Sequence, residues 1–213
     1  MTAKIFTVAQ QKGGAGKTTL AAHLAVAWTA AGKSVAVVDI DPQMSLTYWY
    51  RLRERRSGNA GAGLLVTQIR GWRVRNEAER LAQQHDIVVI DSPPHMETEA
   101  RAAVRAANLV VVPVQPSPMD VWATRPTLDL AKEERRAIAI VLNRVPPRAR
   151  LTDDMLAEIE DFDVTVTQAR IGNRVVFASA LAQGRAVGEM QPKGRAAAEI
   201  GALADELLEL VGT

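Results

Sequence analysis

The sequence predicts an α/β protein with a single doubly wound sheet, mostly parallel and flanked by helices on both faces. Short β-branched runs alternate along the chain with longer stretches rich in alanine and leucine, which is the pattern of such sheets. Two of the runs, 87–90 and 109–112, lack polar alternation, as expected for strands buried on both faces. A glycine-rich segment follows the first run, as in phosphate-binding loops. We expect one domain over residues 1–213.

The order of the elements follows from these runs. The stretch 21–28 is apolar nearly all round, which predicts a buried first helix, and Gly32 ends that helix. The glycine-rich stretch 57–63 predicts a surface loop. Strands are expected at 4–9, 34–39, 64–68, 86–91, 108–114, 137–142 and 163–167. Helices are expected at 17–31, 45–56, 73–84, 97–106, 121–135, 152–160 and 195–211.

The loop after the first strand reads KGGAGKTT over residues 12–19. The ordinary phosphate-loop pattern is G-x-x-x-x-G-K-[ST], so Gln11 replaces the first glycine and Lys12 is an additional lysine. Lys17 is expected to reach the β- and γ-phosphates, and the Thr18 hydroxyl is placed to bind Mg²⁺. The charge of Lys12, at the mouth of the loop, also requires an anionic partner. The residues expected to contact phosphate are Lys12, Gly13, Gly14, Ala15, Gly16, Lys17, Thr18 and Thr19.

Three aspartates follow two of the predicted strands. Asp39 and Asp41 come at the end of the second strand, and Asp91 ends the fourth. In a parallel sheet the carboxyl ends of all strands lie on one edge, so these carboxylates can converge on a metal held by the phosphate loop. An apolar strand ending in an acid is the Walker-B arrangement, which makes Asp91 an expected Mg²⁺ ligand, through water. A single strand-end aspartate could equally cap a helix or form a turn.

The composition excludes several classes of protein. Cysteine is absent, which excludes disulfides, thiolate metal sites and cysteine nucleophiles. The first strand begins within about four residues of Met1, so we expect no signal peptide. No stretch approaches the roughly 18 consecutive apolar residues of a membrane span. We therefore expect a soluble, cytoplasmic protein.

The net charge is only +2, but the basic residues are clustered. Arginine-rich segments occur at 51–56, 70–75 and 144–150. Such clusters permit contact with nucleic acid, although solvated helix faces have the same composition. The aromatic residues 48–50 could stack on bases or anchor an exposed helix to the core, and Trp72 is a candidate partner contact. The three histidines share no metal-ligand spacing.

The segments QKGGAGKTT, VVDIDPQ and VVIDSPP, in this order, resemble the ParA/MinD family of deviant Walker-type ATPases. The resemblance covers nearly the whole chain. The segments DPQMSL and VVPVQPSPMD are most similar to the small ParF-like partition ATPases, which lack an N-terminal operator-binding domain. The resemblance implies a P-loop ATPase that uses ATP and Mg²⁺ and forms an ATP-dependent homodimer.

The resemblance also implies roles for single residues. Lys12 is the signature lysine that reaches across a nucleotide-sandwich dimer to the partner's phosphates, which makes it catalytic together with Lys17. Asp41 orients the attacking water, and Asp39 supports the loop. The expected metal set is Thr18, Asp39 and Asp91.

The base-binding residues are also inferred from the resemblance. Asn143 corresponds to a strand-end asparagine that hydrogen-bonds adenine, although the sequence alone predicts a turn residue there. The proline-rich segment 113–118 corresponds to one that supports the adenine pocket and the dimer face, and it could equally be a stiff loop. The segment 191–194, with Pro192, is a further candidate base contact.

The resemblance further implies slow hydrolysis until a cargo-bound, ParB-like adaptor completes the site. Relatives that bind membranes end in a basic amphipathic helix, whereas residues 196–213 here contain four acids and no lysine or arginine. A membrane partner is therefore not expected. Relatives that bind DNA non-specifically use scattered basic residues, which implies association with the nucleoid of a bacterium or archaeon. The candidate DNA contacts are Arg170, Arg174, Arg185, Lys193 and Arg195.

Two other functions remain open from the sequence. One is a metabolic enzyme of the same fold that spends ATP to activate a carboxylate, for which Lys12 would not be needed. The other is a nucleotide-switched regulator that binds a protein partner but not DNA. The combination of Lys12 with the DPQ segment at 41–43 favours the DNA-associated ATPase.

Overall fold

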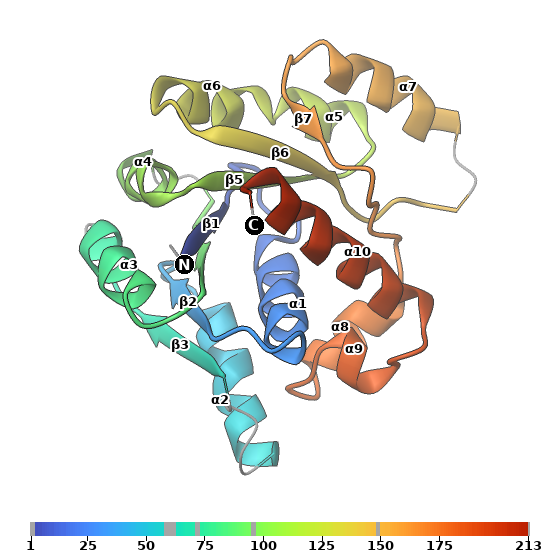
Figure 1. Cartoon of the computed structure of the whole chain (residues 1–213). Helices are drawn as coiled ribbons and strands as arrows, with labels where there is room; N and C mark the ends of the chain where they lie inside the picture. The colour runs from blue at the N-terminus through green and yellow to red at the C-terminus, as the bar shows by residue number, and fades with distance from the viewer. Residues whose placement is uncertain (1–2, 58–62, 71–72, 95–96, 148–149, 213) are drawn as a thin grey trace.

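Seven strands form one sheet in the order β3-β2-β4-β1-β5-β6-β7 (Figure 1). The computed structural model describes residues 3–57, 63–70, 73–94, 97–147 and 150–212. Trp72 and His95 lie outside these ranges. Every described strand pair is parallel, which confirms the doubly wound sheet and makes it fully parallel over this part of the chain. The strands are β1 (Lys4–Val8), β2 (Val35–Asp39), β3 (Leu64–Gln68), β4 (Ile87–Asp91), β5 (Leu109–Val114), β6 (Ala137–Leu142) and β7 (Thr165–Val166).

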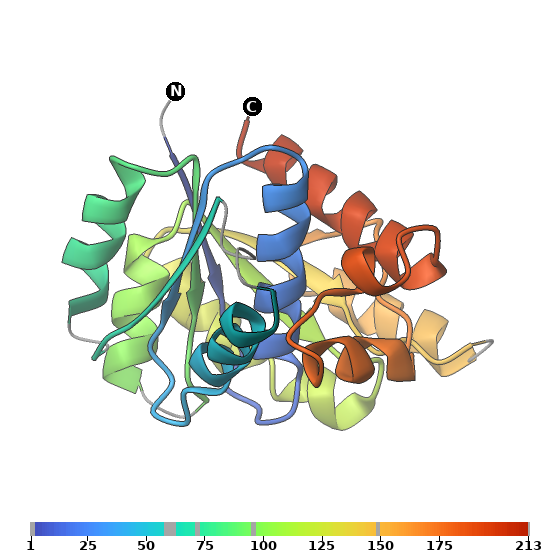
Figure 2. The same cartoon turned by 90° about the horizontal axis from the view of Figure 1, so that it is seen from below.

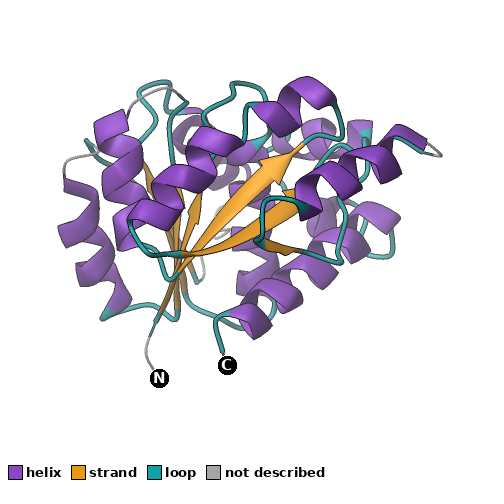
Figure 3. Ribbon diagram, turned by 90° about the horizontal axis from the view of Figure 1, so that it is seen from above, coloured by secondary structure: helices purple, strands orange, loops and turns teal. Residues whose placement is uncertain are grey.

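Helices cover both faces of the sheet (Figure 3). On one face lie α1 (Lys17–Ala30), α2 (Ser45–Ser57), α8 (Val175–Leu181), α9 (Val187–Met190) and α10 (Arg195–Leu210). On the other face lie α3 (Val74–Ala82), α4 (Glu97–Ala106), α5 (Pro118–Trp122), α6 (Arg125–Glu133) and α7 (Arg150–Glu160). Among the described helices, none combines the length and the hydropathy that crossing a membrane would require.

Alternate residues of each central strand enter opposite halves of the core. In β4, Ile87 and Val89 pack with α1 and α10, whereas Val88 and Ile90 pack with α3. Both sets are fully buried, which explains why these strands lack polar alternation. The first helix is buried nearly all round as predicted, and the Trp28 ring stacks on Phe6 with centroids 4.8 Å apart.

Two predicted elements differ from the structure, and two short helices lie where no helix is predicted. The helix expected at 121–135 is two helices, because the ring of Pro126 removes an N–H and breaks the ladder after α5. The last strand is only two residues long, since β7 pairs with β6 at Thr165 and Val166 alone. The short helices α8 and α9 were not predicted, because segments of seven and four residues carry little periodicity.

The two described ends of the chain lie side by side, away from the phosphate loop. Both termini emerge at the same side of the molecule in Figure 2. The Nζ atom of Lys4 donates to the backbone carbonyl of Val211 at 2.9 Å, which joins β1 to the end of α10. The loops that carry the candidate site lie at the opposite edge of the sheet, where the carboxyl ends of the parallel strands meet.

Candidate functional site

The loop between β1 and α1 has the backbone of a phosphate cradle. Gly14 and Gly16 have φ values of 79° and 92°, in the left-handed region. A Cβ atom at Gly16 would lie 2.5 Å from Nδ2 of Asn143, so only glycine fits this position. The loop leads directly into α1, which begins at Lys17, so free N–H groups of the first helical turn face the same point.

Side chains from β5 and β6 support the loop from behind. Asn143, buried at the end of β6, donates from Nδ2 to the carbonyl of Ala15 at 2.8 Å. Gln115, after β5, donates from Nε2 to the carbonyl of Gly14 at 3.1 Å. These hydrogen bonds turn the carbonyl groups of the loop away from its mouth and leave the N–H groups for an anion.

The additional lysine is held within its own subunit. The Nζ atom of Lys12 lies 2.7 Å from Oδ2 of Asp120 on α5. Ser117, which caps α5, donates its hydroxyl to the same oxygen at 2.5 Å. The Lys12 side chain is 34% exposed and that of Asp120 is 9% exposed, so the lysine is accessible while its partner is largely buried. The sequence did not point to Asp120, because its spacing from Ser117 indicates only a helix start.

The other lysine of the loop lies deeper. Lys17 is buried, and burial lowers the pKa of its ammonium group, while the nearby carboxylates of Asp91 and Asp41 oppose that shift. The lysine therefore lies close to both acids. A partly desolvated cation at the start of α1 attracts phosphate strongly, and the contact of Lys17 with phosphate stays a prediction.

Asp39 and Asp91 meet at the edge of the sheet as predicted. They are Cα partners in the register of β2 and β4, and Asp91 is also the partner of Val8, immediately before the phosphate loop. Asp91 is fully buried, and burial raises the pKa of its carboxyl group to about 7. The Thr18 hydroxyl and the charge of Lys17 act in the opposite direction and lower this pKa. Although the Thr18 hydroxyl is near enough to do so, neither carboxylate oxygen of Asp91 has a donor at hydrogen-bond distance and angle in the described part of the protein. A buried carboxylate of this kind is suited to a cation or an ordered water.

Asp39 has a different environment from Asp91. Its Oδ2 accepts hydrogen bonds from the N–H and the hydroxyl of Thr47, at 2.9 and 2.7 Å, and its Oδ1 accepts one from the N–H of Asp41 at 3.1 Å. Asp39 thereby caps the first turn of α2 and holds the loop that bears Asp41. The geometry agrees with the predicted loop-supporting role. Its predicted role as a metal ligand stays a prediction.

Asp41 lies in the loop between β2 and α2. Its Oδ1 accepts a hydrogen bond from the N–H of Gln43 at 2.9 Å, and its carbonyl accepts one from the N–H of Met44. Met44 has a φ of 53°, which closes this turn. The loop thus places a half-buried carboxylate beside Lys17 and Asp91, as an acid that orients water would require.

A cavity of about 260 Å³ opens beside the phosphate loop. It is walled by the start of α1, the end of β6 and the segment that leads into α8, and Ile200 of α10 is also part of its lining. The mixture of an aromatic ring, aliphatic groups and a strand-end amide is typical of a site for a purine base. Its lining includes Gly16, Thr19, His23, Asn143, Arg144, Arg174 and Phe177.

The remaining predicted contacts with nucleotide or DNA lie in three different environments. Arg174 forms an ion pair with Glu199 of α10, at 2.5 Å, and its side chain also lines the cavity. Its guanidinium group therefore already has a carboxylate partner within the protein. Pro192 is exposed in the turn before α10 and is not part of the cavity lining. Exposed candidate DNA contacts are Arg170, Arg185, Lys193 and Arg195.

The sequence matches the family described as the CobQ/CobB/MinD/ParA nucleotide binding domain over residues 6–187. The chain belongs to this family. It is 33% identical over 214 residues to the maintenance of carboxysome distribution protein A of Halothiobacillus neapolitanus, covering 96% of this chain and 97% of that protein. The predicted ParA/MinD family and its ATPase class are therefore confirmed, while the finer likeness to ParF-like ATPases stays a prediction.

Solved structures of this family have the same fold. The cell division ATPase MinD of Pyrococcus furiosus is 21% identical with a TM-score of 0.81, over 97% of this chain and 99% of that chain. Cobyrinic acid a,c-diamide synthase of Mycobacterium smegmatis, with a bound ATP analogue and magnesium, is 22% identical with a TM-score of 0.78, over 99% and 96%. Because one is a cell division ATPase and the other a synthase, the fold alone does not decide the function.

The residues of the site fit a nucleotide with Mg²⁺. The glycine cradle exposes N–H groups, Lys17 supplies charge, and the unpartnered oxygens of Asp91 lie beside Thr18. Within the described ranges, no group of three or more histidines and acids is arranged to hold a metal by itself. Such a site suits Mg²⁺, which commonly takes only one or two protein ligands and completes its shell with water and phosphate oxygens.

Proposed function

We propose that this protein is an ATPase that dimerises around ATP, binds DNA without regard to sequence and positions a cargo. The observation that carries the proposal is Lys12, a second lysine at the mouth of the phosphate loop. Its charge is balanced by Asp120 of the same subunit at 2.7 Å, and its side chain is still accessible. Similarity to a carboxysome distribution protein over nearly the full length supports a positioning role.

The nucleotide is ATP with Mg²⁺. Lys17 would contact the β- and γ-phosphates, and Thr18 and Asp91 would hold the metal, directly or through water. The Mg²⁺ ion would neutralise charge that develops on the transferred phosphoryl group. Asp41 would orient the attacking water while Asp39 holds its loop in place, as their hydrogen bonds suggest. The cavity beside Asn143 would receive the adenine base, with Pro192 as a further candidate contact.

The second subunit supplies the missing charge. In a sandwich dimer, Lys12 would leave Asp120 and contact the γ-phosphate bound by the partner. The short helix α5 next to this pair presents two large apolar side chains, Met119 and Trp122, which are 66% and 56% exposed. Exposed apolar groups of this size beside a functional lysine are typical of a contact surface.

Turnover would be slow in the isolated protein. Phosphoryl transfer depends on positioning and electrostatic stabilisation, so a site that lacks the partner's Lys12 is incomplete. Hydrolysis would then act as a timer that separates the dimer, and a cargo-bound adaptor of the ParB kind would accelerate it. The protein would spend its ATP-bound time on the nucleoid, working as a single domain.

The test is binding to a random-sequence duplex with ATP, with ADP, and with ATP after Lys12→Ala. We expect salt-sensitive binding with ATP only, accompanied by a dimer in solution, and loss of both in the variant. Binding that ignores the nucleotide, or no binding at low salt, would contradict the proposal. Activation of a carboxylate by a Lys12→Ala variant with unchanged rate would instead favour the metabolic alternative.

A further inference from the structure

The outer face of α2 carries arginines that form no ion pair with a carboxylate in the part of the chain that the structure describes. Tyr48, Arg51 and Arg55 are spaced by three and four residues, so they form one exposed stripe, and Arg56 lies beside its end. Among the described residues, none of these three arginines forms an ion pair with an acid. We refer to Tyr48, Arg51, Arg55 and Arg56 as the α2 basic face.

Two other exposed helices, α3 and α4, pair arginines with acids. On α3, Arg75 pairs with Glu79 at 2.9 Å and Arg80 pairs with Glu77 at 2.7 Å. On α4, Arg101 and Arg105 both pair with Glu134. The α2 helix contains a single acid, Glu54, against four arginines. The α2 helix therefore has an excess of positive charge that α3 and α4 do not have.

The aromatic ring at the start of this face is also available. Tyr48 is 55% exposed, although a side chain of this size is usually packed. The guanidinium carbon of Arg51 lies 6.0 Å from the centre of its ring. A tyrosine next to an arginine offers a hydroxyl donor and a planar surface beside a cation, which suits contact with a sugar-phosphate backbone.

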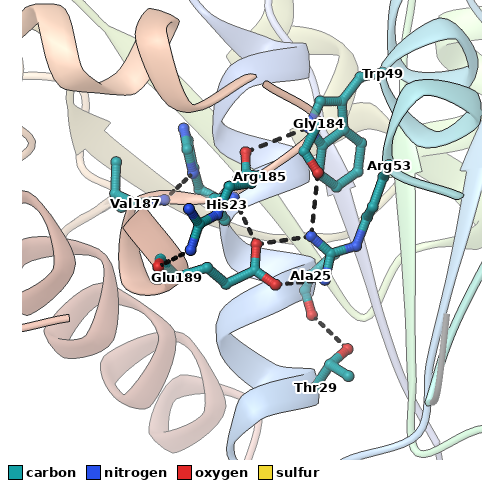
Figure 4. Close-up of polar contacts among 10 residues, drawn as sticks. His23, Ala25, Thr29, Trp49, Arg53, Gly184, Arg185, Val187 and Glu189 are labelled. Atoms are coloured by element: carbon teal, nitrogen blue, oxygen red, sulfur yellow. Dashed lines mark hydrogen bonds and ion pairs between the residues drawn. The ribbon is translucent and has the colours of Figure 1, made fainter. Parts of the chain in front are cut away.

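A further exposed arginine, Arg185, lies on a loop that packs against α2. The loop between α8 and α9 packs directly on α2, because a Cβ atom at Gly184 would lie 2.8 Å from the backbone nitrogen of Arg53. The indole N–H of Trp49 donates to the carbonyl of Arg185 at 3.4 Å. Figure 4 shows this loop against α2, with Arg185 next to the contact. The guanidinium group of Arg185 donates to the carbonyl of Glu189, and its side chain is exposed on the loop that packs against α2.

A buried ion pair fixes the two elements together. Arg53, on the inner side of α2, donates to both carboxylate oxygens of Glu189, at 2.7 and 2.5 Å (Figure 4). The Arg53 side chain is only 7% exposed. Bidentate pairs of this kind set orientation as well as distance. The α2 basic face and Arg185 are thus held in one rigid surface.

The same helix is tied to the candidate nucleotide site. Its first turn is capped by Asp39 through the N–H and the hydroxyl of Thr47. Asp39 is in turn the register partner of Asp91. Binding of nucleotide at the sheet edge would therefore act on the position of α2.

We propose that the α2 basic face, together with Arg185, binds the phosphate backbone of double-stranded DNA. This rests on the proposed function, and it selects the cluster at 51–56 as the DNA-binding surface, a cluster that the sequence left open between contact with nucleic acid and a solvated helix face. The occupant follows from charge complementarity: the guanidinium groups form a stripe of fork-shaped donors that match phosphate oxygens and read no bases.

The experiment compares two double variants that remove equal charge. Arg51→Ala/Arg55→Ala removes two arginines of the α2 basic face, and Arg101→Ala/Arg105→Ala removes two from α4. Affinity for a random-sequence duplex is measured with ATP over a salt series. We expect the α2 variant to bind the duplex about 10–100-fold more weakly than the wild type. The slope of log K against log salt is negative, and its magnitude should decrease by about 2, because each lost phosphate contact changes it by about 0.9. The α4 variant should match the wild type.

Each outcome decides the proposal. ATP-dependent dimerisation of the α2 variant is measured in parallel and should be unchanged. Weaker DNA binding can then be attributed to the lost arginines and not to loss of the dimer. Unchanged DNA affinity and salt slope in the α2 variant would overturn the inference and leave the proposed function standing. A wild type that binds no DNA with ATP at low salt would end both. The inference would also be overturned if the α2 variant lost binding to anionic phospholipid vesicles that the wild type binds, while its DNA binding stayed intact.

Discussion

Lys12 and Asp120 are 108 residues apart in the sequence and form an ion pair at the mouth of the phosphate loop, with Nζ 2.7 Å from Oδ2. The carboxylate is largely buried, and its other oxygen has no hydrogen-bond partner in the described part of the chain. Removing the lysine would leave a buried anion without compensation. Asp120 therefore competes with any phosphate for Lys12, and the proposed dimer has to overcome that competition.

Neutralising the competitor should favour the dimer. In Asp120→Asn, the amide can still accept the hydrogen bond from Ser117, but Lys12 loses its ion pair. We expect the protein concentration for half-maximal dimerisation with ATP to fall about 5–10-fold. This corresponds to about 1–1.4 kcal/mol per dimer, or about 0.5–0.7 kcal/mol for each of the two partly exposed Lys12–Asp120 pairs that the dimer would release. Analytical ultracentrifugation with a non-hydrolysable ATP analogue measures it.

The matched control for this variant is Asp129→Asn, which removes one charge from an exposed acid of α6. Its dimerisation should be unchanged. Weaker dimerisation of Asp120→Asn would show that Asp120 supports the dimer face and does not compete for Lys12. The double variant Lys12→Ala/Asp120→Asn should not dimerise.

Gly16 should tolerate no side chain, unlike Gly13 in the same loop. Gly16→Ala forces a Cβ atom to 2.5 Å from Asn143 at a φ of 92°, whereas a Cβ atom at Gly13 meets nothing within 4 Å. We expect Gly16→Ala to lower the free energy of unfolding by about 1–3 kcal/mol and to abolish ATP binding. Gly13→Ala should change the free energy of unfolding by less than about 0.5 kcal/mol. Urea unfolding and a fluorescent ATP analogue measure both. Equal stability of the two variants would contradict the close approach of Asn143.

The sequence predicts those parts of the site that depend on local backbone geometry and on strand ends. Glycines at fixed spacing determine the phosphate loop, and a parallel sheet brings Asp39 and Asp91 into register without further information. The strands from β1 to β6 have β-branched runs long enough to show the pattern, whereas β7 forms over only two residues of its predicted range.

The parts that the sequence did not predict depend on contacts between distant segments. Asp120 meets Lys12 only because α5 follows β5, the neighbour of β1 in the sheet. Asn143 holds the Ala15 carbonyl in this structure, a role that its position after a strand does not indicate. The sequence shows a cluster of arginines at 51–56, but it does not show which of them form ion pairs. In the structure Arg53 pairs with Glu189, whereas Arg51, Arg55 and Arg56 are in no ion pair among the described residues.

The buried pair between Arg53 and Glu189 should contribute more to stability than an exposed pair. Arg53→Met leaves the half-buried carboxylate without its cation, so we expect the free energy of unfolding to fall by about 3 kcal/mol. Arg75→Met breaks a pair whose two side chains are 63% and 58% exposed, and it should cost less than about 0.5 kcal/mol. Urea denaturation at constant pH compares the two. Similar small losses would mean that α2 is not held by this pair.

His23 should make stability depend on pH between neutral and mildly acidic conditions. Burial lowers the pKa of its imidazole to about 4, from an ordinary value of 6.5. Its Nδ1 accepts a hydrogen bond from the N–H of Val187, and its ring packs edge-on against Phe177. Above pH 6.5 both folded and unfolded states hold the neutral ring. As the pH falls towards 4, only the unfolded state gains a proton, so the free energy of unfolding decreases by about 3 kcal/mol.

The variant His23→Gln lacks this titration and keeps a side chain that can accept the Val187 hydrogen bond. Between pH 7 and pH 4, its free energy of unfolding should fall by about 3 kcal/mol less than that of the wild type. Chemical denaturation at a series of pH values measures the difference, and the carboxylates shared by both proteins cancel from it. Parallel pH profiles would show that the imidazole accepts a proton in the folded protein, and hence that the segment around Val187 opens readily enough to hydrate it.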